Sequence, residues 1–168
     1  MIFFIRRAYA GGSNSNIVVG IEPTRNDPRD LQHYMDTCKP YVLILSPTSK
    51  HMGEIAGMMA AIQMSAGRHF VVDQLWDNCV YTLPIWQQLA QHVAWCYVHH
   101  CSVGLVDEHT QRPLDKVSEV WASDERLVSP LRGFVCKCTQ RHAVADWDVA
   151  AKPQVLPTAI SRGIAKGC

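Results

Sequence analysis

The chain has 168 residues, of which 48% are apolar and 18% charged, and its net charge is +1. This length suits one domain with a sizeable core, and the small net charge excludes a global field that would draw the protein to nucleic acid. No apolar run approaches the roughly 18–20 residues that a membrane-spanning helix needs, so we expect no membrane span. Seven cysteines, an odd number without a small-domain disulfide pattern, favour an intracellular, reducing compartment.

Strands and helices alternate along the predicted chain. Short apolar runs predict strands at 2–5, 17–21, 41–45, 69–73, 103–106, 119–122 and 134–138. Helix-forming composition and stop signals predict helices at 30–38, 54–66, 84–97, 124–131 and 157–166. This alternation favours a three-layer α/β domain over 28–168, preceded by an N-terminal strand and loop segment over 1–27. The basic, acid-free start of that segment also resembles an organelle transit segment, but we favour the ordinary strand.

The strand expected at 41–45 runs directly into the loop Ser46-Pro47-Thr48-Ser49. Open α/β sheets present their catalytic residues in this kind of place, at the carboxyl end of a buried strand. The next expected strand, 69–73, ends in Asp73. These two strand ends are therefore where we look first for chemistry.

Three stretches together carry a family resemblance. They are KPYVLILSPTS (39–49), GRHFVVDQLW (67–76), and a third stretch that runs from CSVGLVD (101–107) through KVSEVWAS (116–123), Cys136, Cys138 and His142 to LPTAISRGI (156–164). In order and spacing they resemble the cytosine-5 DNA methyltransferase-like domains of some retroelement polyproteins. The resemblance implies a mostly parallel, Rossmann-like sheet, truncated in its N-terminal half.

The chain departs from that family at the residues that perform the reaction. The family places Pro-Cys after one strand and Glu-Asn-Pro or Glu-Gln-Pro after the next, whereas this chain has Ser49, Asp73 and Leu75 at the matching positions. Attack on a pyrimidine ring needs a thiolate, and Ser49 has no adjacent base in the sequence. We therefore expect a vestigial site at Pro47, Thr48, Ser49 and Asp73, and no catalysis.

The resemblance also implies a cofactor, because the family binds S-adenosylmethionine through a glycine-rich loop after its first strand. The matching candidates in this chain are Gly11 and Gly12, with Glu22 in place of the ribose-binding acid. A loop with two glycines is a weak signal for a nucleotide site. We expect no bound cofactor.

Cysteine and histidine gather in two places, at 96–101 and at 136–142. A zinc site made of His99 or His100 with Cys101, Cys138 and His142 is chemically reasonable, because zinc favours four Cys and His ligands. On a strand, Cys136 and Cys138 would point the same way. The alternative is that these residues are small buried thiols and partly exposed imidazoles.

We expect a non-catalytic, retroelement-derived pseudoenzyme that serves as a structural or interaction subunit, with a protein partner. One alternative is an S-adenosylmethionine-dependent methyltransferase acting on a nucleic-acid base. A second is a nucleic-acid-binding module that uses the basic region from Arg126 onward, which holds seven Lys and Arg residues and two acids. Such a module would bind with a steep salt dependence.

Overall fold

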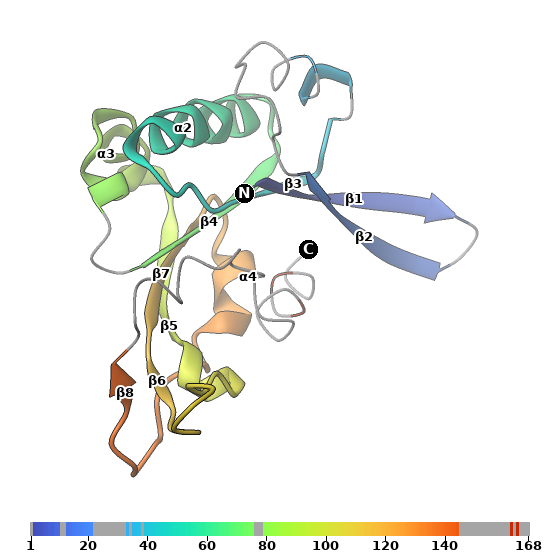
Figure 1. The fold of residues 1–168 in the computed structure, drawn as a ribbon. Helices are drawn as coiled ribbons and strands as arrows, with labels where there is room; N and C mark the ends of the chain where they lie inside the picture. Colours follow the sequence, from blue (N-terminus) through green and yellow to red (C-terminus); the bar gives the residue numbers. More distant parts are fainter. Residues whose placement is uncertain are drawn as a thin grey trace.

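The computed structural model describes residues 2–10, 13–21, 33, 35–37, 39–75, 79–144, 162 and 164. Its main feature is a six-stranded sheet with the order β2-β1-β3-β4-β7-β5 (Figure 1). The strands are β1 (Ile2–Ala10), β2 (Ser13–Ile21), β3 (Val42–Leu45), β4 (His69–Leu75), β5 (Ala94–His99) and β7 (Val117–Ala122). Within the described ranges, no helix is long and apolar enough to cross a bilayer.

The sheet is mixed rather than mostly parallel. Only β3 and β4 pair in parallel, because the crossover between them contains the helix α2 (Lys50–Ser65). The other described pairings of this sheet are antiparallel. The strand β7 is antiparallel to β5 because the chain leaves β5, folds through 100–116 and returns beside it, and β7 is also antiparallel to β4. The α/β class is confirmed, and the expected parallel sheet is reduced to one pairing.

Helical segments cover both faces of the sheet, which gives the expected three layers (Figure 1). On one face, α2 and α3 (Pro84–Leu89) pack over a core that includes Phe70 and Trp86. The opposite core includes Val71, which packs with α4 (Glu125–Val128) and the 3-10 turn η4 (Ser129–Leu131). Neighbouring residues of a strand enter different cores because successive side chains point to opposite faces.

The N-terminal segment continues the same sheet. β1 pairs antiparallel with β2 and also with β3, where Ile2 lies opposite Leu45. Strands were expected at 2–5 and 17–21, and the observed strands are longer at Ile2–Ala10 and Ser13–Ile21.

The predicted helix at 84–97 is wrong in its second half. The helix α3 ends at Leu89, a 3-10 turn η2 covers Ala90–His92, and β5 begins at Ala94. Apolar residues recur every four positions here, but β5 buries every second residue, Cys96 and Val98. Aromatic and β-branched residues favour a strand, and the pairing with β7 makes it one.

Two other predicted strands are also replaced. Residues 100–103 form the 3-10 turn η3 (His100–Val103), and Val106 makes only an isolated bridge with Pro113. Residues 134–139 have no regular structure, although the Cys136 and Cys138 side chains do point into the same cluster, as expected.

Candidate metal centre

Residues 100–116, between β5 and β7, form together with residues 134–144 a small lobe beyond the end of the main sheet (Figure 1). Its regular structure is the turn η3 and a two-stranded parallel sheet of β6 (Leu114–Asp115) and β8 (Ala143–Val144). Gly104 ends η3 with a φ of 85°, a conformation that glycine adopts without steric cost. None of the buried hydrophobic residues lies in 100–116 or 134–144, so the lobe has little apolar core of its own.

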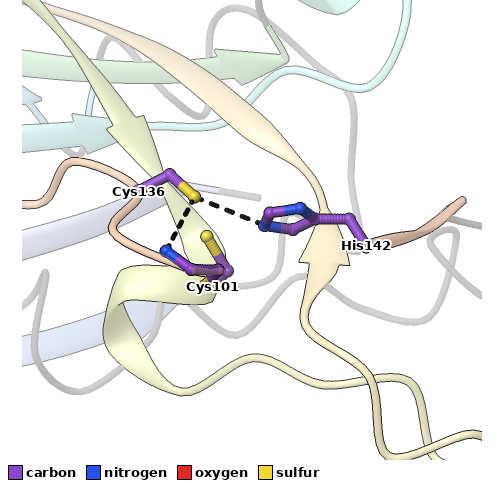
Figure 2. A group of neighbouring side chains, drawn as sticks. Cys101, Cys136 and His142 are labelled. Atoms are coloured by element: carbon purple, nitrogen blue, oxygen red, sulfur yellow. Dashed lines mark hydrogen bonds between the residues drawn. The ribbon is translucent and has the colours of Figure 1, made fainter. Parts of the chain in front are cut away.

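Four side chains converge inside this lobe. The ligating atoms of Cys101, Cys136, Cys138 and His142 all lie within 4.8 Å of one another. Figure 2 shows Cys101, Cys136 and His142 turned toward one another from separate segments of the chain. The Cys136 Sγ lies 3.4 Å from His142 Nε2, and the Cys138 backbone N–H donates to Cys136 Sγ at 3.5 Å.

These distances fit a tetrahedral zinc ion. With Zn–S bonds of about 2.3 Å and Zn–N bonds of about 2.0–2.1 Å, tetrahedral geometry puts two sulfurs about 3.8 Å apart and a sulfur and nitrogen about 3.5 Å apart. The observed 3.4 Å between Cys136 and His142 agrees with the second value. Three thiols and one imidazole also form a donor set that favours zinc over hard cations such as Mg²⁺ and Ca²⁺. The four residues present therefore fit a zinc ion.

The three thiols of the cluster affect one another's ionisation. Burial raises the pKa of the Cys101 thiol to about 12, and its neighbours Cys136 and Cys138 contribute in the same direction. The Cys138 backbone N–H instead holds the pKa of Cys136 below its usual value. Three adjacent thiols cannot all ionise without a compensating charge, and a divalent ion supplies that charge when it binds.

The structure brings together three of the expected zinc ligands, Cys101, Cys138 and His142, while Cys136 stands where His99 was expected. His99 is not part of the cluster. It is the last residue of β5, and its side chain lies on the same face of the strand as exposed Tyr97 and on the opposite face from buried Val98. The other histidine considered, His100, is buried and bonds elsewhere.

The His100 side chain lies against β7 instead of the cysteines. It is 3% exposed, and its Nε2 lies 2.7 Å from the hydroxyl of Ser118. Burial lowers the pKa of His100 to about 4, and the nearby Lys116 and His99 act in the same direction. His100 is therefore neutral near pH 7.

The residues of the expected vestigial site do not converge. Ser49 caps α2, because its hydroxyl accepts a hydrogen bond from Met52 N–H at 3.2 Å. Thr48 is exposed beside it, and Pro47 is buried. Asp73 lies within β4 rather than after it, and the residue that reaches the loop is Gln74, whose amide donates to Pro47 O at 2.9 Å.

Asp73 lies on the opposite face of β4 from Gln74 and is 4% exposed. Burial raises the pKa of this carboxyl, while a hydrogen bond from Ser118 and the charge of Lys116 act in the opposite direction. The cofactor candidates Gly11, Gly12 and Glu22 lie outside the described residues.

Comparisons with protein-family models, with curated proteins and with solved structures find no match to this chain.

Proposed function

We propose that this chain is a zinc-stabilised, non-catalytic α/β domain that serves as a structural or interaction subunit of a larger assembly. The observation that carries the proposal is the convergence of Cys101, Cys136, Cys138 and His142. Structural zinc sites use four protein ligands, whereas catalytic sites keep one position open for water or substrate. A set of three cysteines and one histidine fills all four positions, so zinc would hold the lobe in shape.

The absence of catalysis is supported by what Ser49 and Asp73 do in the fold. Ser49 is engaged at the start of a helix, and Asp73 is buried on the face of β4 that points away from the Pro47 loop. A nucleophile and its acidic partner must approach the same substrate atom closely. A degenerate relative of the cytosine-5 methyltransferase-like domains would keep the strand–helix–strand unit β3–α2–β4 in this way and lose its chemistry.

A protein partner is favoured by an aromatic pair on the edge strand β5. Trp95 and Tyr97 are 49% and 43% exposed, and their rings touch edge to face with centroids 5.3 Å apart. Aromatic side chains are enriched in protein interfaces, where they contribute much of the binding energy.

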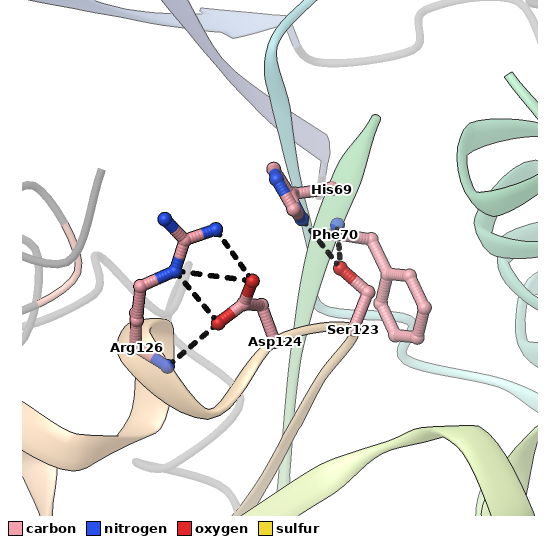
Figure 3. Close-up of polar contacts among 5 residues, drawn as sticks. All are labelled: His69, Phe70, Ser123, Asp124 and Arg126. Atoms are coloured by element: carbon pink, nitrogen blue, oxygen red, sulfur yellow. Dashed lines mark hydrogen bonds and ion pairs between the residues drawn. The ribbon is translucent and has the colours of Figure 1, made fainter. Parts of the chain in front are cut away.

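Ion pairs neutralise part of the positive charge on which the nucleic-acid-binding alternative depends. Arg126 pairs with Asp124 in the turn that begins α4 (Figure 3), and Arg132 pairs with Glu125. Both arginines belong to the basic region that would contact phosphate. Cations already matched by carboxylates release fewer counterions on binding, which weakens the expected affinity.

The test has two arms on the purified chain. We expect inductively coupled plasma mass spectrometry to find about one zinc ion per chain in the parent protein and none in Cys138→Ser. The matched control Cys79→Ser alters an exposed thiol outside the cluster and should keep its zinc. We expect calorimetric titration with S-adenosylmethionine to give no heat. A parent without zinc would refute the structural role, and micromolar binding of S-adenosylmethionine would instead support the methyltransferase alternative.

A further inference from the structure

A buried polar chain connects the metal lobe to the main sheet. Its members are His100 in η3, Ser118 in β7 and Asp73 in β4, and they are 3%, 2% and 4% exposed. His100 Nε2 and Ser118 Oγ are 2.7 Å apart, and Ser118 in turn stabilises the Asp73 carboxylate. Since a hydroxyl carries one proton, a Ser118 that donates to Asp73 accepts from the Nε2–H of His100. The three groups then form one directed chain of hydrogen bonds.

His100 is also fixed through its backbone. Its N–H donates to Lys116 O at 2.9 Å, and its carbonyl accepts from Leu105 N–H at 3.1 Å. The first bond joins the start of η3 to the segment that leads into β7, and the second closes the turn. His100 is thus held by its main chain and its side chain, and the next residue along is Cys101.

The chain of hydrogen bonds is costly for the fold. Two of its atoms, Asp73 Oδ1 and His100 Nδ1, are buried and have no hydrogen-bond partner among the described residues. A buried polar network with unmatched atoms is less favourable than an apolar contact of the same shape. Val98 lies opposite Ser118 on β5, and Val120 lies opposite Asp73 on β7, and both are buried, so the core accepts aliphatic side chains there.

We propose that His100 is a positioning residue for the zinc site: its bond to Ser118 sets the orientation of η3 so that the Cys101 thiol meets Cys136, Cys138 and His142. The inference rests on the proposed zinc site and extends it to a residue that touches no ligand atom. Cys101 is the only one of the four on the β5–β7 side of the lobe; the other three come from 136–142. The four ligands meet only when η3 and the segment 136–142 are correctly placed relative to each other. His100 fixes η3 to the sheet through its bond to Ser118.

The experiment compares zinc affinity, measured by competition with a chromogenic chelator, in the parent and in His100→Leu. We expect His100→Leu to bind zinc about tenfold more weakly, which is the lower end of the loss seen when a residue that orients a ligand is removed. His100→Gln places an amide near the Nε2 position and should recover most of the affinity. The matched control is Gln63→Leu, which removes another buried side chain that bonds to Pro40 O, far from the cysteines. It should lower stability without changing zinc affinity.

Cobalt substitution supplies a readout that a general loss of stability would not move. We expect the d–d absorption of the cobalt-loaded parent to show tetrahedral ligation and that of His100→Leu to be weaker and shifted. If His100→Leu does not fold, Ser118→Ala removes the same hydrogen bond with a smaller change in volume and should weaken zinc binding in the same direction. A parent that binds zinc and a folded variant that binds it within twofold of the parent would overturn this inference alone. A parent that binds no zinc would overturn the proposed function as well.

Discussion

The side chain that completes the metal cluster is Cys136 rather than the expected His99. Successive residues of β5 face opposite sides of the sheet, so His99 points away from the side on which Val98 is buried. Cys136 and Cys138, by contrast, lie in an irregular segment where the Cys138 N–H turns back onto Cys136 Sγ. Residue types and spacing could identify the candidates, but the choice among them depended on where β5 ends.

That choice can be tested directly. We expect Cys136→Ser to abolish tight zinc binding because a four-ligand site loses one of its thiolates, and His99→Ala to bind zinc as the parent does. Chelator competition on the two variants measures both effects side by side. Loss of zinc from His99→Ala with retention in Cys136→Ser would restore the ligand set expected from the sequence.

At Ser49 the structure assigns a structural role to a position where the family resemblance implies a nucleophile. Removing the N-cap by Ser49→Ala should lower the free energy of unfolding by about 1 kcal/mol, because the Met52 N–H loses its acceptor. Ser49→Asp, which keeps a capping oxygen, should cost little. Denaturant unfolding with a constant m-value measures both variants, and equal stability of Ser49→Ala and the parent would contradict the capping role.

Strands and helices were predictable from the sequence where the local hydrophobic pattern agrees with the strand pairing in the fold, and they were not predictable where the two conflict. Both strands are buried on both faces; the strand at 42–45 is a continuous apolar run and the strand at 69–75 has the apolar run 70–72 at its centre, so both were predictable from the sequence. The region 84–99 carries a helical period and a strand composition at once, and only its contact with β7 decides between them. The antiparallel placement of β7 between β4 and β5 has no local signal, because it depends on the return of the chain through the lobe.

The contact between α2 and α3 gives an element-scale prediction that opposes helix propensity. A Cβ atom added at Gly57 would lie 2.5 Å from Ile85 Cγ2, a distance at which the Ile85 side chain or one of the two helices must shift. Gly→Ala normally stabilises a helix interior by about 1 kcal/mol, but overpacking costs about 1–3 kcal/mol, so we expect Gly57→Ala to destabilise the protein.

A double-mutant cycle separates the two effects. Ile85→Ala removes the clashing methyl groups, so Gly57→Ala introduced into that background should be neutral or stabilising, because only the propensity term remains. Thermal unfolding of the four proteins gives the coupling. An equal destabilisation in both backgrounds would show that α2 and α3 do not pack as closely as the structure has them.

At the scale of the whole molecule, two units differ in what stabilises them. The sheet with α2, α3 and α4 has two apolar cores, while the lobe of 100–116 and 134–144 has one pair of short strands and the Cys and His cluster. Regions with few buried apolar contacts open at low free energy unless another interaction stabilises them. Zinc at 1,000 times its dissociation constant would supply about 4 kcal/mol to whichever part of the fold forms the site.

Removal of the metal should therefore act on the lobe first. We expect hydrogen exchange, measured by mass spectrometry after treatment with a strong chelator, to accelerate in peptides that cover 100–116 and 134–144, while peptides from α2 and β4 keep their protection. Reloading with zinc should restore the parent pattern, and Cys101→Ser should reproduce the chelated one without any chelator. Equal loss of protection across α2, β4 and the lobe would mean that the sheet cannot fold without the metal, and unchanged exchange everywhere would mean that the four residues do not bind it.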